Sequence, residues 1–312
     1  MDTKAAPISR PGLLNLLVVY LVWSSTYLAI RVAVAGSNGF NVLSAGYIRM
    51  LLAGILLILF CVIRKYPIRI TLQELAVFGL SGCFLWVGGN GLIMWAEKQA
   101  DSGFAALVVS STPLIVAGIE SVLNKKAPSK ILTFSLLLAF IGLWILLGPA
   151  WRGLGGNSLM PAIALLAGTV SWSVGTVYQA RQNLDLPAPV AAAYQHLSAG
   201  ILFLMLSIAR GQYIPDAGPN EWLALLYLVV FGSVLAFTAY VKTLQLLPIN
   251  LAMTYAFVNP VLALFLGWAI LNEQINLFTL LGALVVILGV VGVFWERVAI
   301  QRPGTSKTTD IS

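Results

Sequence analysis

Charged residues are unusually scarce in this sequence. Of 312 residues, 9% are Asp, Glu, Lys or Arg and 59% are hydrophobic, whereas about one quarter of a typical soluble domain is charged. A chain of this composition cannot cover a water-exposed surface with polar groups. The composition therefore excludes a soluble globular fold.

Histidine, cysteine and metal-binding motifs are also scarce. The chain has one histidine, His196, and two cysteines, Cys61 and Cys83. It contains no H-E-x-x-H motif and no acidic cluster. We therefore expect no metal site, no disulfide and no cofactor. A lone histidine such as His196 is more often a hydrogen-bonded packing residue than a titrating group.

Long apolar runs account for nearly the whole chain. A helix needs about 20 residues to cross hydrocarbon, and ten runs are of that order: 13–34, 42–62, 75–96, 103–123, 131–149, 159–179, 189–209, 222–242, 250–271 and 277–297. Residues 51–60 are apolar all round, whereas a strand of a membrane barrel alternates polar and apolar positions. The sequence predicts an all-α integral membrane protein with ten transmembrane helices in a lipid bilayer.

Lysines and arginines are unequally divided between the connections. With a cytoplasmic N-terminus, the outer connections contain only Arg31, Lys98, Arg152 and Arg210, and the inner ones contain Lys4, Arg10, Arg64, Lys65, Arg69, Lys125, Lys126, Lys130, Arg181, Lys242, Arg297, Arg302 and Lys307. Positive charge is enriched on the cytoplasmic side of membrane proteins. We therefore predict a multi-pass protein of the cell (plasma or inner) membrane with both termini cytoplasmic. The net charge of +7 then reflects orientation, and we expect no nucleic-acid partner.

The two halves of the chain resemble each other weakly but in order. Trp23-Ser24 matches Trp172-Ser173, Ala53-Gly54 matches Ala199-Gly200, Arg49 lies opposite Gln195, Pro113 matches Pro260, and Gly142 matches Gly289. The offsets stay between 146 and 149 residues. Self-similarity at a nearly fixed offset is the signature of a repeated structural unit.

Each half contains five predicted spans, so the second half enters the membrane from the opposite side. We predict two inverted five-helix repeats, 13–149 and 159–297, preceded by a cytoplasmic segment 1–12 and followed by a disordered cytoplasmic tail 298–312. Such repeats are common in secondary transporters, which bind substrate near the membrane midplane. The pattern is compatible with a monomer or a homodimer.

Three further motifs complete an ordered set. They are Trp95-Ala96-Glu97, Ser102-Gly103 and Leu271-Asn272-Glu273. Together with the matched residues, the set resembles the EamA-type branch of the drug/metabolite transporter superfamily over residues 14–296. The resemblance implies ten helices, export of small metabolites or drugs, and no nucleotide-hydrolysing subunit. The sequence departs from a symmetric pattern where Lys125-Lys126 stand opposite Glu273, which argues against a matched pair of acids.

Arg49 is the charged residue that lies most clearly inside a predicted span. A charge there costs at least about 2.5–3.5 kcal/mol on insertion scales, so it needs a partner or water. It could bind an anionic group of the substrate. Alternatively, it could be a structural residue that reaches Glu97 or Asp101, because long arginine side chains extend toward the interface.

Aromatic and amide side chains in the spans are the other candidates for substrate binding. Trp23, Tyr27, Trp86 and Trp172 could stack on an aromatic or cationic ligand, or could only fill space between helices. Asn90 lies among three glycines, Gly88, Gly89 and Gly91, and could bind substrate or clamp two helices together. With Arg49 and Gln195, these residues are predicted to border a central cavity.

Pro113, Pro260 and Glu120 are candidates for conformational or coupling roles. Proline inside a helix removes a hydrogen bond and favours a kink, so the matched prolines are predicted hinges, although membrane helices also tolerate proline routinely. Glu120 could carry a coupling proton. Its place near a span end also suits a solvated acid paired with Lys125 or Lys126.

Three functional classes follow from these observations. A transporter of small molecules explains the inverted repeat. An intramembrane enzyme would need a nucleophile, a metal or paired acids and bases, which the sequence does not provide. A channel is usually built from symmetric subunits around a shared pore, whereas the halves here differ at most polar positions.

The predicted topology can be tested with reporter fusions. A cytoplasmic reporter fused after Lys65 or Lys126 should be active, and one fused after Arg152 or Gly211 should be inactive, because the spans between these points are odd in number. A periplasm-type signal after Lys126 would contradict the inverted repeat.

Overall fold

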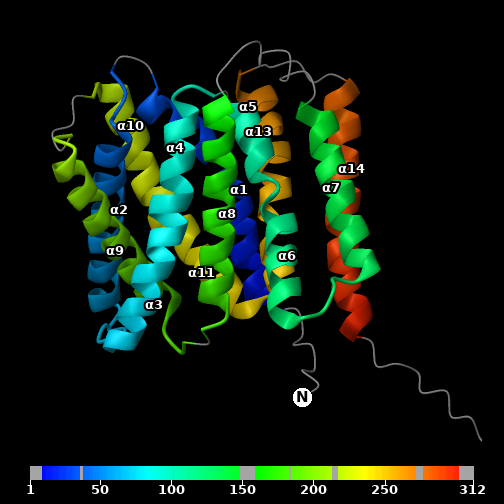
Figure 1. Cartoon of the computed structure of the whole chain (residues 1–312), viewed down its shortest axis with the longest axis horizontal. Helices are drawn as coiled ribbons and strands as arrows, with labels where there is room; N and C mark the ends of the chain where they lie inside the picture. The colour runs from blue at the N-terminus through cyan, green and yellow to red at the C-terminus, as the bar shows by residue number, and fades with distance from the viewer. Residues whose placement is uncertain are drawn as a thin grey trace, which may run out of the picture.

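A computed structural model of the chain describes residues 9–35, 38–100, 102–147, 159–182, 184–212, 217–271 and 277–301. These residues form helices that run side by side as one bundle (Figure 1). Asp101 and Glu273, residues 1–8 of the predicted N-terminal segment and residues 302–312 of the predicted tail lie outside the described residues.

The first half forms five helical spans. They are α1 (Arg10–Val34), α2 (Val42–Ile63), the continuous α3–η1–α4 (Leu72–Gly82, Cys83–Asn90 and Gly91–Glu97), α5 with α6 (Ser102–Val109 and Thr112–Asn124), and α7 (Lys130–Leu147). The segment η1 is a π-helix. It includes Gly88, Gly89 and Asn90, and glycine lowers the stability of a regular α-helix.

The second half repeats this order. Its spans are α8 (Leu159–Ala180), α9 (Ala188–Ala209), the continuous α10–η3–α11 (Pro219–Tyr227, Leu228–Leu235 and Ala236–Leu246), α12 with α13 (Ile249–Ala252 and Tyr255–Leu271), and α14 (Leu277–Gln301). A π-helix again interrupts the third span and a break again divides the fourth. The α14 helix continues through residues 298–301, so the predicted tail begins later than residue 298.

The helices have the length and surface expected in hydrocarbon. Among the described residues, six helices are long and apolar enough to cross a membrane, and four shorter apolar helices accompany them. Large apolar side chains such as Leu21, Leu59, Phe134 and Ile163 are exposed along their outer faces. Such a surface suits lipid and would be unfavourable in water. The chain is therefore a ten-helix membrane protein with two inverted five-helix repeats.

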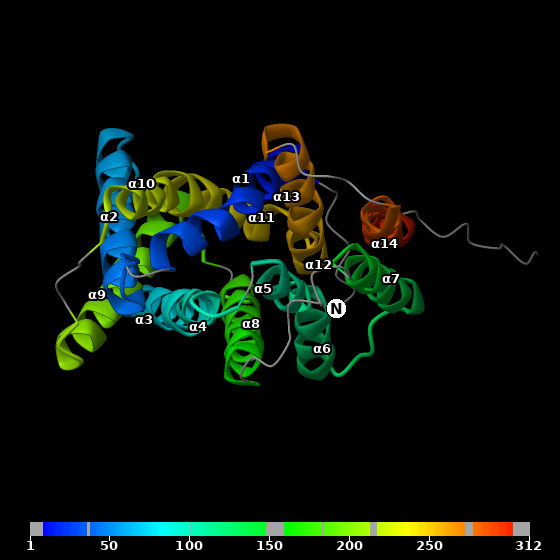
Figure 2. The same ribbon diagram turned by 90° about the horizontal axis from the view of Figure 1, so that it is seen from above.

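The first helix of each half packs into the other half. Helix α1 lies against α10, α11 and α13, and α8 lies against η1, α4 and α6. Figure 2 shows this exchange from above, with α1 among the helices of the second half. The two repeats are therefore interlocked, and neither half closes its own core alone.

Equivalent helices of the two halves also pack in pairs. Helices α7 and α14 stand together at one edge of the bundle, and α2 and α9 contact each other at the opposite edge (Figure 2). Glycines allow the close approach: a Cβ on Gly142 would lie 2.5 Å from the Val286 nitrogen, and one on Gly289 would lie 2.5 Å from the Ala139 nitrogen. Small residues bring membrane helices together in this way.

This packing predicts that Gly142→Ala and Gly289→Ala each destabilise the protein. Overpacking typically costs about 1–3 kcal/mol, and here the neighbouring atoms are backbone and cannot rotate away. Thermal unfolding of the purified protein in detergent should therefore begin at a lower temperature for both variants.

Gly118→Ala is the matched control for these substitutions. A Cβ on Gly118 in α6 would meet no atom within 4 Å, and alanine favours a helix over glycine by roughly 0.5–1 kcal/mol. Its unfolding temperature should be unchanged or higher. Equal behaviour of all three variants would contradict the close contact of α7 with α14.

Candidate transport site

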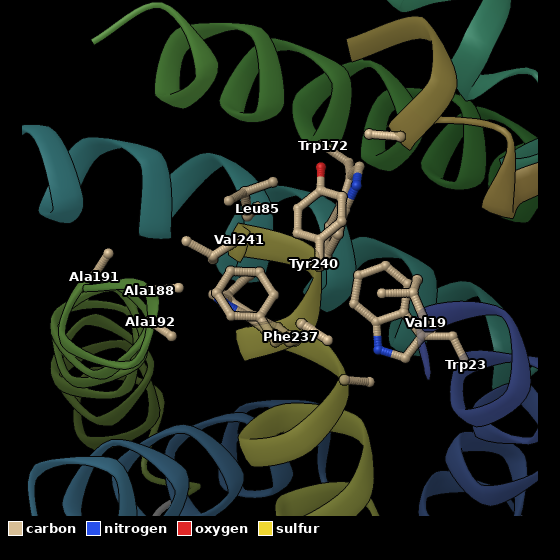
Figure 3. Close-up of a cluster of buried hydrophobic side chains, with 14 of the residues drawn as sticks. Val19, Trp23, Leu85, Trp172, Ala188, Ala191, Ala192, Phe237, Tyr240 and Val241 are labelled. Carbon is tan, nitrogen blue, oxygen red and sulfur yellow. The ribbon is translucent and has the colours of Figure 1, made fainter. Parts of the chain in front are cut away.

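Six aromatic side chains form a connected layer across the centre of the bundle. We call Trp23, Trp86, Trp172, Phe237, Tyr240 and Tyr255 the aromatic layer. The matched residues Trp23 and Trp172 meet edge to face at 5.7 Å between ring centroids. Trp23 lies 5.2 Å from Tyr240 and 4.9 Å from Tyr255. Figure 3 shows Trp23, Trp172, Phe237 and Tyr240 turned toward one another from α1, α8 and α11.

Hydrogen bonds fix the orientation of two of these rings. The Trp23 indole nitrogen donates to the carbonyl of Gly232 in η3 at 3.0 Å. The Tyr240 hydroxyl is hydrogen-bonded to the Thr176 hydroxyl in α8. The first bond joins α1 to η3, and the second joins α8 to α11. The layer therefore connects α1 and α8 to the third span of the second half.

A small cavity of about 60 Å³ lies beside the layer, toward the end of the bundle where α1 ends. Its lining residues come from both halves: Trp23, Thr26, Tyr27, Ile30, Arg49, Trp86, Asn90, Ile93, Val109, Thr112, Thr169, Trp172, Tyr255 and Asn259. Such a space holds a few water molecules. A metabolite could enter it only after the surrounding helices move apart.

A much larger hollow of about 930 Å³ lies at the end of the bundle where α1 begins. We call it the vestibule. It is bordered by Tyr66, Pro67, residues 184–189 and α11, and its charged lining residues among those described are Asp185 and Lys242. Asp185 and Gln245 in its wall are exposed, so the vestibule opens to the surface. The aromatic layer lies between it and the small cavity.

Arg49 contributes a buried positive charge to the small cavity. Its Nε donates to the Ser233 hydroxyl at 2.9 Å, and its Nη1 donates to Asn90 Oδ1 at 3.1 Å. The guanidinium lies 5.1 Å from the centroid of the Trp86 ring, a distance suited to cation–π attraction. The side chain is 2% exposed. Its partners among the described residues are all neutral, and Glu97 is not one of them.

Most of the predicted site residues meet at this cavity. Trp23, Tyr27, Arg49, Trp86, Asn90 and Trp172 all line it. Gln195 lies elsewhere: its amide nitrogen donates to Ser81 and Gln179, each at 2.8 Å. It joins α9 to α3 and α8 and is absent from the described lining of the small cavity.

Glu120 lies at the surface, away from the small cavity. Its carboxylate accepts a hydrogen bond from Arg181 at 2.8 Å and another from Asn124. The expected pairing with Lys125 or Lys126 is therefore replaced by a contact with α8 of the other half. The sequence does not reveal this partner, because Glu120 and Arg181 are far apart along the chain and meet only where the two halves pack together.

The matched prolines occupy different local structures. Pro113 stands in the first turn of α6, directly after a break at Ser110 and Ser111. Pro260 lies inside α13, and the break in that span occurs earlier, at Met253 and Thr254. The fourth span of each half is thus interrupted, but not at the same place relative to its proline.

Several site residues were not identified from the sequence. Thr26, Thr112, Thr169, Tyr255 and Asn259 also line the small cavity. Asn259 directly precedes Pro260 in an otherwise apolar span, so its polar side chain could have identified it from the sequence. Glu97 is 1% exposed, although it ends its span. No sequence signal distinguishes it from a solvated helix end.

Both halves of the chain are similar to one family of known proteins. Residues 10–148 and 159–295 each match the EamA-like transporter family. The chain is 33% identical over 283 residues to the uncharacterized inner membrane transporter YedA of Escherichia coli strain K12, covering 88% of both chains. It is 23% identical to the uncharacterized transporter YoaV of Bacillus subtilis strain 168, covering 89% of this chain and 94% of that one.

A crystal structure of another protein has the same fold. It aligns with a TM-score of 0.75 and 21% sequence identity over 93% of this chain and 99% of its own. The family match covers both repeats and is independent of the site geometry. The chain is therefore a membrane transporter of the EamA-like family.

Proposed function

We propose that the protein is a secondary transporter that exports small amphipathic metabolites, such as amino acids or related compounds, or drugs. The observation that carries this proposal is the pair of hollows on opposite sides of one aromatic layer. The vestibule opens to the surface at one end of the bundle, whereas the small cavity toward the other end is lined mostly by buried residues and is too small for a metabolite. A solute can pass from one to the other only if the layer and its helices rearrange.

Alternating access is the mechanism that this arrangement supports. Inverted repeats can exchange conformations, so that a state open at one end has a counterpart open at the other. The π-helices η1 and η3 and the breaks in the fourth spans are the places where the bundle is least regular. We infer that these segments, together with Pro113 and Pro260, act as hinges.

The orientation follows from the distribution of charge. The vestibule lies at the end that carries Lys65, Lys126 and Lys242, which the positive-inside rule assigns to the cytoplasm. In this orientation both termini are cytoplasmic, and the state described here is open inward. A solute would enter the vestibule from the cytoplasm, as an exporter requires.

Arg49 is the residue best suited to recognise the substrate. A buried guanidinium with neutral partners keeps its full charge for a carboxylate or another anionic group, and arginine binds carboxylates in a bidentate manner. Trp23, Trp86 and Trp172 surround the same space and offer ring faces and edges to an apolar or aromatic body. The site thus suits a molecule with an anionic group and a nonpolar part.

A transport panel in liposomes tests the proposed function. The purified protein should move one or more members of a set of amino acids and cationic dyes, with the rate changing when a pH gradient is imposed. Movement that needs no gradient would indicate a facilitator. Single-channel currents through the purified protein would overturn alternating access.

Arg49→Ala should reduce transport of an anionic or zwitterionic substrate by roughly 10- to 100-fold. A hydrogen bond to a charged group contributes about 1.5–3 kcal/mol, and each 1.4 kcal/mol is about a tenfold change in affinity. Arg49→Lys should retain part of the activity, because the charge remains but the bidentate geometry is lost. Initial rates in liposomes measure the effect.

Glu120→Gln is the comparison variant, and it should lower transport only partly because Glu120 lies outside the small cavity. Each variant counts only if it elutes as a folded species. Abolished pH-driven transport in Glu120→Gln with intact transport in Arg49→Ala would reverse the assigned roles. Normal transport in both would indicate an uncharged site.

A further inference from the structure

The two π-helices identify equivalent residues in the two halves. Segments η1 and η3 are each eight residues long and begin at Cys83 and Leu228. Glu97 and Lys242 each follow 14 positions after the first residue of their π-helix. Because the repeats are inverted, these equivalent residues lie toward opposite ends of the bundle. One is an acid and the other is a base.

Lys242 lies in the wall of the open vestibule. Its side chain is partly buried and forms no ion pair or hydrogen bond with any residue that the structure describes. Asp185, the other charged residue in the described lining, is exposed in the connection between α8 and α9. Thr238 lies one turn before Lys242 in the same wall. Solutes that reach Thr238 therefore enter the field of a lysine.

Glu97 takes the equivalent place at the closed end. Neither of its carboxylate oxygens accepts a hydrogen bond from a described residue. Among the described ionisable groups, Tyr27 and Arg31 lie close enough to interact with it electrostatically. Tyr27 lines the small cavity, and so does Ile93, one turn before Glu97 in α4. Opening of this end would bring solvent to the carboxylate.

We propose that Lys242 and Glu97 select solutes by charge in two vestibules that open alternately. Lys242 attracts anionic groups into the vestibule described here. Glu97 lines the corresponding vestibule when the opposite end opens, where it disfavours anions and promotes their departure. This inference rests on the proposed alternating access. The charges change which solutes enter from each side, whereas solute and ion gradients determine the direction of net transport.

The physical basis is the concave, low-dielectric wall around each charge. A charge in the wall of a cleft raises the local concentration and association rate of oppositely charged solutes, and in the vestibule the partly buried Lys242 is screened less than the exposed Asp185. Partly buried charges are screened by salt less than exposed ones. Arg49 follows Lys242 as the next cation, on the far side of the aromatic layer. An anion that crosses the bundle therefore passes Lys242 and then Arg49 before it reaches Glu97, which itself lies in the field of Arg31.

Thiol labelling tests the inner charge without knowledge of the substrate. A single cysteine, Thr238→Cys, is placed in a protein with Cys61→Ala and Cys83→Ala. In inside-out vesicles it is labelled with anionic sulfonatoethyl or cationic trimethylammonioethyl methanethiosulfonate, and each rate is divided by the rate with a free thiol. The anionic reagent should be favoured, and Lys242→Gln should lower the ratio by about threefold or more.

Lys130→Gln is the matched control for this measurement. It removes the same charge from an exposed position at the start of α7, outside the described lining of the vestibule. The ratio should remain unchanged. Lys242→Met gives a second variant of similar length and should act like Lys242→Gln. An unchanged ratio in both Lys242 variants would overturn the proposal.

The outer charge is tested with Ile93→Cys in right-side-out vesicles. Ile93 lines the small cavity one turn before Glu97. Here the cationic reagent should be favoured, and Glu97→Gln or Glu97→Met should remove the preference, whereas Glu221→Gln at the start of α10 should not. A preference that survives both Glu97 variants would overturn this half of the proposal.

The side from which each cysteine reacts gives a separate answer. Alternating access requires that Thr238→Cys react from the inside and that Ile93→Cys, which lines the proposed substrate site, react from the outside. Failure of Ile93→Cys to react from the outside would overturn the proposed function whatever the charge ratios. Correct sidedness with unchanged ratios would overturn only the roles of Lys242 and Glu97.

Discussion

The buried charge of Arg49 constrains the centre of this protein. A guanidinium in a membrane-spanning helix costs several kcal/mol unless polar groups surround it, and here those groups come from two other helices. Asn90 belongs to η1 in the first half, and Ser233 belongs to η3 in the second. The third spans of both halves are therefore held at a common point. Both depart from regular α-helix where they meet it.

The aromatic layer depends on the same irregular segments. Trp23 donates its indole hydrogen to Gly232 inside η3, and Trp86, inside η1, lies against the Arg49 guanidinium. Because α1 and α8 each pack into the opposite half, Trp23 and Trp172 meet at the boundary between the repeats. A change in the π-helices would move the layer and the arginine together. In the proposed mechanism, this coupling would link substrate recognition to the opening of the barrier.

The sequence predicts the fold and much of the site because the few polar and tryptophan residues within its apolar spans are easy to recognise. In spans that are almost wholly apolar, Arg49, Asn90 and the tryptophans stand out, and the repeat indicates that Trp23 and Trp172 are equivalent. These residues border one cavity in the structure. That they bind substrate remains a prediction.

Other features depend on information that span positions do not contain. The rotation of α9 about its axis decides which residues Gln195 contacts. In the structure this rotation turns the Gln195 side chain toward Ser81 and Gln179. Glu120 meets Arg181 because the halves interlock. The burial of Glu97 depends on how the neighbouring helix ends pack around it. The vestibule is bordered in part by the connection between α8 and α9, and hydropathy gives the limits of such a connection but not its conformation.

The most direct test of the account is a pair of distances measured by electron paramagnetic resonance between spin labels. One pair, at positions 66 and 245, spans the vestibule. The other, at positions 100 and 212, is the equivalent pair at the opposite end of the bundle. On addition of a transported substrate, the first distance should shorten as the second lengthens. Two distances that stay fixed, or change in the same sense, during active transport would contradict a single barrier that opens alternately to each side.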